Sequence, residues 1–128
     1  MAEQRSARIP NFDKARERLL SGSVAEALAE FERCVQQGVA PVASRFYYGL
    51  CRFRQDDFAA AVEDFEEVVR LEPWDHIAHF YAGLCYERLG RVADARRSRQ
   101  LAYEMNDRLV AYPAERGQTP SPGLRRSA

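Results

Sequence analysis

One pattern occurs three times along this chain at a fixed spacing of 34 residues. Alanines recur at that spacing as Ala27, Ala61 and Ala95. The segment 46–51, FYYGLC, is matched one period later by the segment 80–85, FYAGLC. A repeat of this length is typical of stacked helix pairs, in which each unit buries its apolar face only against its neighbours. The sequence therefore predicts an all-α fold built from three helical hairpins.

Capping and turn residues mark the expected ends of the helices. Pro10 suits the first turn of a helix, because its missing N–H group has no partner to lose there, and this helix is expected to run to Leu20. Ser23 and Glu26 have the spacing of a capping box and should begin the second helix, which ends at Gly38. Later boundary residues are Pro41, Pro73 and Asp75, and the hairpin turns are expected at Gly22, Asp56 and Gly90.

The apolar stripe of the second helices is interrupted in the last one. Arg96 takes the position that Leu28 and Val62 hold in the earlier helices. Arg99 takes the position that Phe31 and Phe65 hold there. A final helix has no following repeat to contact, so a polar outer face is expected and the array is predicted to end here. Residues 107–112 either prolong this helix or form a short extra turn. The domain boundaries are then a polar lead-in, 1–7, a repeat domain, 8–112, and a Pro-, Ser- and Arg-rich tail predicted to be disordered, 113–128.

Composition argues against several classes of function. The 128 residues suffice for one domain, and 19 basic and 19 acidic residues give a formal net charge of zero. Bulk attraction to nucleic acid or to an anionic membrane is therefore not expected. No apolar run approaches the ~20 residues that cross a bilayer, and the polar N-terminus lacks the apolar stretch of a signal peptide, so a cytoplasmic location is expected. The odd number of cysteines predicts reduced, buried thiols at Cys34, Cys51 and Cys85.

The repeated positions together resemble those of the tetratricopeptide repeat (TPR) family. Three repeats are identified, at about 8–41, 42–75 and 76–109. The matching positions are the small residue of the first helix, at Ala15, Gly49 and Gly83, the turn residue, at Gly22, Asp56 and Gly90, the close-approach alanine, at Ala27, Ala61 and Ala95, and the aromatic after it, at Phe31 and Phe65. The resemblance implies a right-handed α–α superhelix of three helix pairs, with room for a short C-terminal extension.

Two positions depart from the family pattern. The tryptophan of the first helix is replaced by Asn11, Arg45 and His79, and the later tyrosine is replaced by Arg18 and Arg52 and kept only as Tyr86. The TPR proteins that grip the carboxylate tails of heat-shock chaperones share a clamp of lysine, asparagine and arginine. The corresponding residues here are Phe12, Arg16, Tyr47, Ile77 and Tyr81. Only Arg16 could serve in such a clamp, so this function is not expected.

In this family the first helices of successive repeats line a concave groove. Carried over by position, the candidate peptide-binding residues are Phe12, Arg16, Phe46, Tyr47, Leu50, Arg54, Ile77, Phe80, Tyr81, Leu84 and Arg88. Aromatic residues and arginine anchor protein interfaces, so the groove is expected to hold an apolar segment, with an arginine available to a carboxylate. Alternatively, the phenylalanines pack the two helices of each repeat together, which leaves Tyr47 and Tyr81 as the better groove candidates.

Evidence for other chemistry is weak. Asp75, His76 and His79 begin a helix at a spacing that could hold a metal ion, but two surface histidines are a commoner arrangement. No glycine-rich phosphate loop or nucleophile with a base is evident, so neither a catalytic residue nor a cofactor is predicted. Charge is distributed unevenly, with Glu63, Asp64, Glu66 and Glu67 expected to be exposed on one helix and Arg88, Arg91, Arg96, Arg97 and Arg99 on or near the last. Solvated faces explain this pattern, and self-association by opposite charge is the alternative.

The sequence thus favours a non-enzymatic adaptor or scaffold whose groove binds a peptide or a segment of another protein. Two alternatives stay open. One is an assembly or secretion chaperone that shields an apolar segment of its partner. The other is a structural subunit that self-assembles through its ends and charged faces. In each case the expected partner is a protein, with no nucleic acid and no insertion into a membrane.

Overall fold

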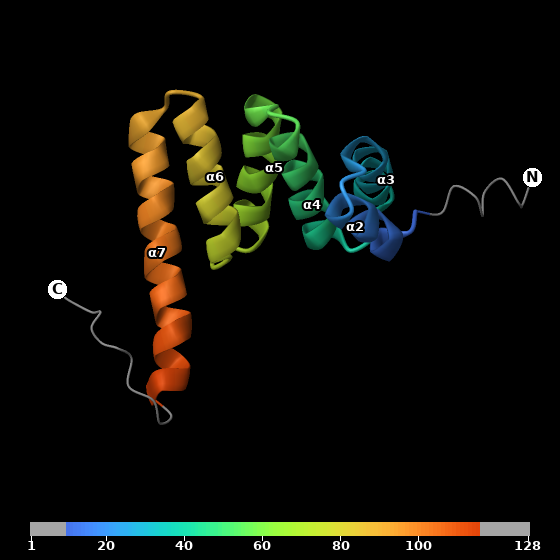
Figure 1. Ribbon diagram of the computed structural model, residues 1–128. Coiled ribbons are helices and arrows are strands. Elements are labelled where there is room, and N and C mark those ends of the chain that lie inside the picture. The colour runs from blue at the N-terminus through green and yellow to red at the C-terminus, as the bar shows by residue number, and fades with distance from the viewer. Residues whose placement is uncertain (1–9, 116–128) are drawn as a thin grey trace, which may run out of the picture.

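The computed structural model describes the backbone of residues 10–115 and the side chains of residues 10–106. This part of the chain forms six helices and no strand. In chain order they are α2 (Phe12–Leu20), α3 (Val24–Gln37), α4 (Pro41–Arg54), α5 (Phe58–Leu71), α6 (His76–Arg88) and α7 (Val92–Glu115). Each helix contacts mainly its neighbours in sequence, so the hairpins stack in a row with α2 and α3 at one end and α7 at the other (Figure 1). The predicted all-α repeat architecture is confirmed.

Several helix ends lie where the sequence signals place them. The carboxylate of Asp75 accepts a hydrogen bond from the N–H of Ala78 at 3.1 Å and caps α6. Pro41 is the first residue of α4. Gly38 follows α3 in the left-handed conformation, with φ of 72°, which glycine adopts without strain.

The first helix begins later than predicted. Pro10 precedes it, and α2 starts at Phe12. Asn11 has an extended backbone, and its side-chain oxygen accepts a hydrogen bond from the N–H of Lys14 at 2.9 Å. Asn11 thereby supplies the N-cap, so the placement of Pro10 inside the first turn was wrong.

The predicted capping box at the start of α3 is not formed. Ser23 occupies the N-cap position, but its side chain makes no capping hydrogen bond. The carboxylate of Glu26 lies 3.7 Å from the guanidinium group of Arg18 on the preceding helix instead. An exposed ion pair across the hairpin turn therefore takes the place of the reciprocal capping bond.

The three hairpin turns each contain a residue with a positive φ. Gly22, Asp56 and Gly90 are one period apart and have φ of 97°, 64° and 78°. The left-handed region is open to glycine and tolerated by aspartate. This explains which residue types occur at the predicted turns.

Apolar side chains of successive hairpins form two buried clusters. The first consists of Ala15, Leu19, Ala27, Phe31, Tyr48 and Cys51. The second consists of Ala61, Val62, Phe65, Ala82, Cys85, Tyr86 and Ala95. In each cluster the first helix of the next repeat covers the preceding hairpin, as the stacking of repeats requires. The three cysteines are free and buried, as predicted.

The last helix is much longer than the others. α7 runs through residues 107–112, which prolong it, and reaches Glu115, three residues past the predicted boundary at 112. The predicted lead-in, 1–7, and the remainder of the predicted tail, 116–128, lie outside the described residues. Within the described part of the chain, no helix is both long and apolar enough to span a membrane.

Candidate functional site

The two tyrosines predicted to line the groove lie at the junctions between repeats. Tyr47 of α4 stacks on Phe31 of α3, with ring centroids 5.4 Å apart and planes 13° apart. Tyr81 of α6 stacks on Phe65 of α5 at 5.5 Å and 21°. Both tyrosines are partly buried, while both phenylalanines are fully buried. The tyrosines therefore contribute to the contact between repeats, whatever else they bind.

The phenylalanines next to these tyrosines differ in exposure. Phe12 contacts Tyr47 edge to face at 5.6 Å, and Phe46 contacts Tyr81 in the same manner at 5.9 Å. Phe80 is the third member of the series and remains 44% exposed. Among the aromatic residues predicted for the groove, Phe80 therefore has the most exposed side chain, and the others are partly buried.

A hollow of about 530 Å³ lies between α6 and α7. Its walls are His76, Ile77, Phe80 and Tyr81 from α6 and Arg99, Ala102, Tyr103 and Asn106 from α7. Ile77 is 45% exposed and Tyr103 is 66% exposed. Large apolar side chains with this much free surface, gathered around one hollow, are typical of an interaction site.

The α7 side of this hollow was not identified from the sequence. Tyr103 follows Val35 and Val69 at the repeat period, and Arg99 follows Phe31 and Phe65. The periodic pattern therefore contained the signal. Arg99 was predicted to lie on the polar outer face of the last helix and Tyr103 to continue its apolar stripe, so neither residue was assigned to the groove.

The predicted groove arginines are engaged locally to different degrees. Arg16 pairs with Asp13 at 3.3 Å and lies over the ring of Phe12. Arg88 lies over the ring of Phe58, 4.9 Å from its centroid. Arg54 is exposed, and Leu50 and Leu84 are half-buried. The cation at the hollow is instead Arg99 of α7, which pairs with Glu87 in the last turn of α6.

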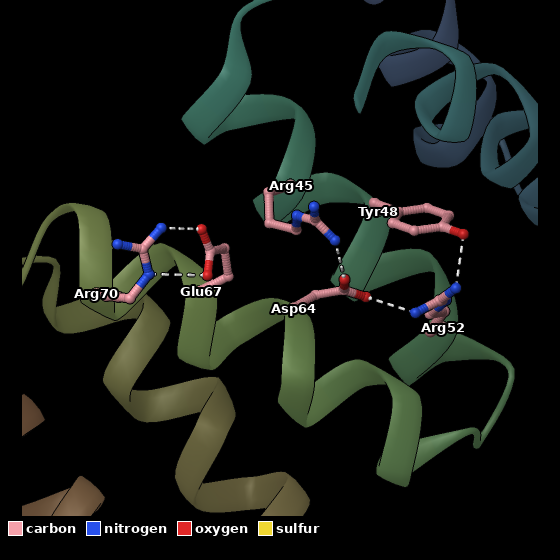
Figure 2. Close-up of polar contacts among 6 residues, drawn as sticks. All are labelled: Arg45, Tyr48, Arg52, Asp64, Glu67 and Arg70. Carbon is pink, nitrogen blue, oxygen red and sulfur yellow. Dashed lines mark hydrogen bonds and ion pairs between the residues drawn. The ribbon is translucent and has the colours of Figure 1, made fainter. Parts of the chain in front are cut away.

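A buried ion-pair network joins α4 and α5, as Figure 2 shows. Asp64 is 1% exposed, although it was predicted to face the solvent. Its carboxylate accepts hydrogen bonds from Arg45 at 3.0 Å and Arg52 at 3.2 Å, and Arg52 also donates to the hydroxyl of Tyr48 at 2.6 Å. Burial raises the pKa of Asp64 above its ordinary value, more than the two arginines lower it.

This network explains the two departures of repeat two from the TPR pattern. Arg45 and Arg52 stand where the family has an aromatic residue, and both point to Asp64 on the facing helix (Figure 2). A carboxylate thus replaces part of the apolar contact between the two helices. Because the arginines make fixed hydrogen bonds inside one hairpin, the network has a structural role.

His79 was predicted to lie on the surface, and this prediction was wrong. It is buried, and its Nε2 lies 2.9 Å from the carbonyl oxygen of Pro73. The carboxylate of Asp75 is used as the N-cap of α6. In the part of the chain that the structure describes, no group of three or more histidine, cysteine, aspartate or glutamate residues is arranged to hold a metal ion.

Fold and site together define a helical-repeat protein whose last hairpin carries a hollow lined by exposed apolar side chains. The model of the tetratricopeptide repeat family matches residues 12–70 and again residues 52–108. The chain therefore belongs to the TPR family. Proteins with this fold generally mediate protein–protein interactions.

Solved structures of the protein MamA share this fold. A crystal structure of MamA has a TM-score of 0.70 and 18% identity, over 77% of this chain and 57% of that one. A structure described as MamA MSR-1 C2 has a TM-score of 0.68 and 19% identity, over 77% of this chain and 59% of that one. This chain thus spans less than three-fifths of the length of those proteins. A comparison with curated proteins finds no match.

Proposed function

We propose that this chain is a non-enzymatic adaptor or scaffold of the cytoplasm that binds a segment of another protein. The observation that carries the proposal is the hollow between α6 and α7. There Ile77, Phe80 and Tyr103 present apolar surface to the solvent around a space of about 530 Å³. Anchoring side chains of a partner commonly enter pockets of this kind at the centre of an interface.

The remaining groove residues extend this site along the first helices. Phe46 and Leu50 on α4 and Leu84 on α6 are half-buried, so part of each apolar side chain stays in contact with the solvent. Arg99 at the hollow and Arg54 on α4 supply guanidinium groups. We expect the partner segment to cover the apolar walls of the hollow and to place a carboxylate near one of these arginines.

The proposal is tested by comparing the proteins captured by two variants of the full chain. The triple variant Ile77→Ala, Phe80→Ala, Tyr103→Ala removes the apolar walls of the hollow. The control is Leu71→Ala, because Leu71 is 39% exposed at the end of α5, a helix that contributes no wall to the hollow. A partner captured by the natural chain and by the control should bind the triple variant at least about tenfold more weakly. A partner that binds all three equally well would show that the hollow is not the site.

A further inference from the structure

The repeat junctions inside the chain follow one rule. Tyr47 is held between Phe12 and Phe31, with centroid distances of 5.6 and 5.4 Å. One repeat later, the corresponding tyrosine is held between the next two phenylalanines: Tyr81 lies 5.9 Å from Phe46 and 5.5 Å from Phe65. Each hairpin therefore provides a socket of two side chains, one from each helix, for a residue of the following first helix.

The hollow between α6 and α7 is the third socket of this series. Phe80 and Arg99 follow the phenylalanine pair of the second socket by one period, and both line the hollow. Within the described part of the chain no following first helix enters it, so Phe80 stays 44% exposed. The hollow thus has the geometry of a repeat junction with its incoming helix missing.

The opposite end of the molecule carries the matching helix. In α2 the position of the junction tyrosines is Asp13, and the position of Cys51 and Cys85 is Glu17. Both acidic residues are exposed, whereas both cysteines are fully buried. Among the residues that the structure describes, none covers the outer face of α2 as α2 to α5 cover the junction faces of α4 and α6.

The charges at the two ends are complementary at two matched positions of α2. Inside the chain, Cys85 belongs to the same buried cluster as Val62 and Phe65. Tyr81 packs against this cluster. At the C-terminal end these two α5 positions are Arg96 and Arg99. In the same register, Asp13 would meet Arg99 and Glu17 would lie among both arginines. Opposite charges at matched positions of a surface steer and orient association.

We infer that the partner for the hollow is a second copy of this chain, which docks its α2 onto α6 and α7 and continues the helical array from one molecule to the next. This inference rests on the proposed function, since it assigns an occupant to the same hollow. The two faces lie at opposite ends of the row of helices (Figure 1), so the contact is head to tail and can propagate.

The charges already present at each end are compatible with this contact. Asp13 pairs with Arg16, and Arg99 pairs with Glu87, but all four side chains are substantially exposed. Exposed ion pairs contribute little free energy, so Asp13 and Arg99 lose little when they leave their present partners and pair with each other. Lys14 also lies on the outer face of α2, and its long side chain can keep its ammonium group in the solvent. Association through exposed ion pairs is expected to be weak and to fall with salt.

Sedimentation equilibrium of the full chain provides the first test. Between about 10 µM and about 1 mM protein, the average mass at low salt should rise above the 14.6 kDa of one chain. At about 0.5 M salt it should fall back toward that mass. A mass that stays at one chain over the whole range at low salt overturns the inference.

Charge reversal provides the second test. Asp13→Arg with Glu17→Arg, or Arg96→Glu with Arg99→Glu, should each lower the association constant at least about tenfold. Mixing the two variants, or combining all four substitutions in one chain, should restore association. The control is Arg97→Glu, since Arg97 lies on another side of α7, in a hollow with Glu66 and His79. Circular dichroism checks that each variant folds.

The outcomes separate this inference from the proposed function. Association that survives either reversal, or that the mixture does not restore, overturns the head-to-tail register. If the chain is a monomer and its partner still binds about tenfold more weakly to the Ile77, Phe80 and Tyr103 variant, the inference fails and the adaptor function stands. If the chain self-associates as predicted but no other protein depends on the hollow, the adaptor function fails and the inference stands.

Discussion

Tyr81 of α6 lies stacked on Phe65 of α5, with ring centroids 5.5 Å apart. Tyr47 and Phe31 repeat this arrangement one hairpin earlier. The phenylalanine of each pair is fully buried, and the tyrosine comes from the following repeat. The same pair of rings therefore closes both junctions of the array, and loss of either pair should open the contact between neighbouring hairpins.

Replacing Tyr81 by alanine should destabilise the fold far more than replacing its neighbour Phe80. Tyr81→Ala removes a ring packed between the half-buried Phe46 and the fully buried Phe65, and we expect the free energy of unfolding to fall by about 2–4 kcal/mol. Phe80 is nearly half exposed, so Phe80→Ala should lower it by less than about 1 kcal/mol. Urea unfolding followed by circular dichroism measures both. Equal losses would show that the exposed ring is as important for folding as the stacked one.

Asp64 and Glu67 on α5 have pKa values that are displaced in opposite directions. Burial raises the pKa of Asp64 above its ordinary value of 3.8. The hydrogen bond from Arg70 lowers the pKa of Glu67 below its ordinary value of 4.5. Both carboxylates are drawn in Figure 2, the first facing α4 and the second beside Arg70 on the same helix.

These shifts predict opposite pH dependences for two variants. A raised folded-state pKa stabilises the fold fully below 3.8, and this contribution is lost as the pH rises through the folded pKa of Asp64. A lowered folded-state pKa stabilises the fold above pH 4.5, and this contribution is lost as the pH falls through the folded pKa of Glu67. On acidification from about pH 7 to about pH 3, the stability of the natural chain should therefore rise relative to Asp64→Asn and fall relative to Glu67→Gln. Urea titrations at each pH measure the two differences, and equal signs would contradict the assignment.

The core could be predicted from the sequence, because its positions recur in register. Ala27, Ala61 and Ala95 are all buried, as the repeat period requires. Asp64 could not be placed in the same way, since a single acidic residue beside three glutamates resembles a solvated face. Its burial becomes evident only when Arg45 and Arg52, 19 and 12 residues away, are brought against it. The arginines at aromatic family positions were the available signal.

The hollow was only half predictable for a related reason. Ile77 and Phe80 could be assigned to an interaction surface from their positions on the first helix. The contribution of Tyr103 depends on how α7 lies against α6, which the apolar pattern of one helix does not specify. Arg99 on the same wall appeared only as a break in the stripe. A site between two helices can be predicted only when the packing of one helix against the other is known. The sequence indicates which face of each helix is apolar, but not how α6 and α7 pack together.

Gly49 and Gly83 occupy equivalent positions but should respond differently to alanine. A Cβ atom at Gly49 would lie 2.8 Å from the Cβ of Asp64 and 3.2 Å from Cε1 of Phe65, both fully buried. Gly49→Ala should therefore lower the free energy of unfolding by about 1–3 kcal/mol. At Gly83 the nearest atom is Cγ of Arg99 at 2.7 Å, so the arginine must change its χ1 rotamer, which its partly exposed side chain permits. The better helix propensity of alanine offsets part of this cost, so Gly83→Ala should lower the free energy of unfolding by less than about 1 kcal/mol. Thermal unfolding of both variants measures this, and an equal loss at both positions would contradict it.

The cysteines should react with alkylating reagents only when the repeats open. Burial raises the pKa of Cys51 and Cys85 to about 12. Because the thiolate is the nucleophile, iodoacetamide near pH 8 should label these two residues at least about a hundredfold more slowly in the folded chain than in urea. An exposed thiol introduced by Leu20→Cys is the matched control and should react at once, since Leu20 is 78% exposed. Mass spectrometry of each site across the urea transition then reports the opening of its hairpin. Rapid labelling of Cys85 in the folded chain would show that the junction between repeats two and three is open in solution.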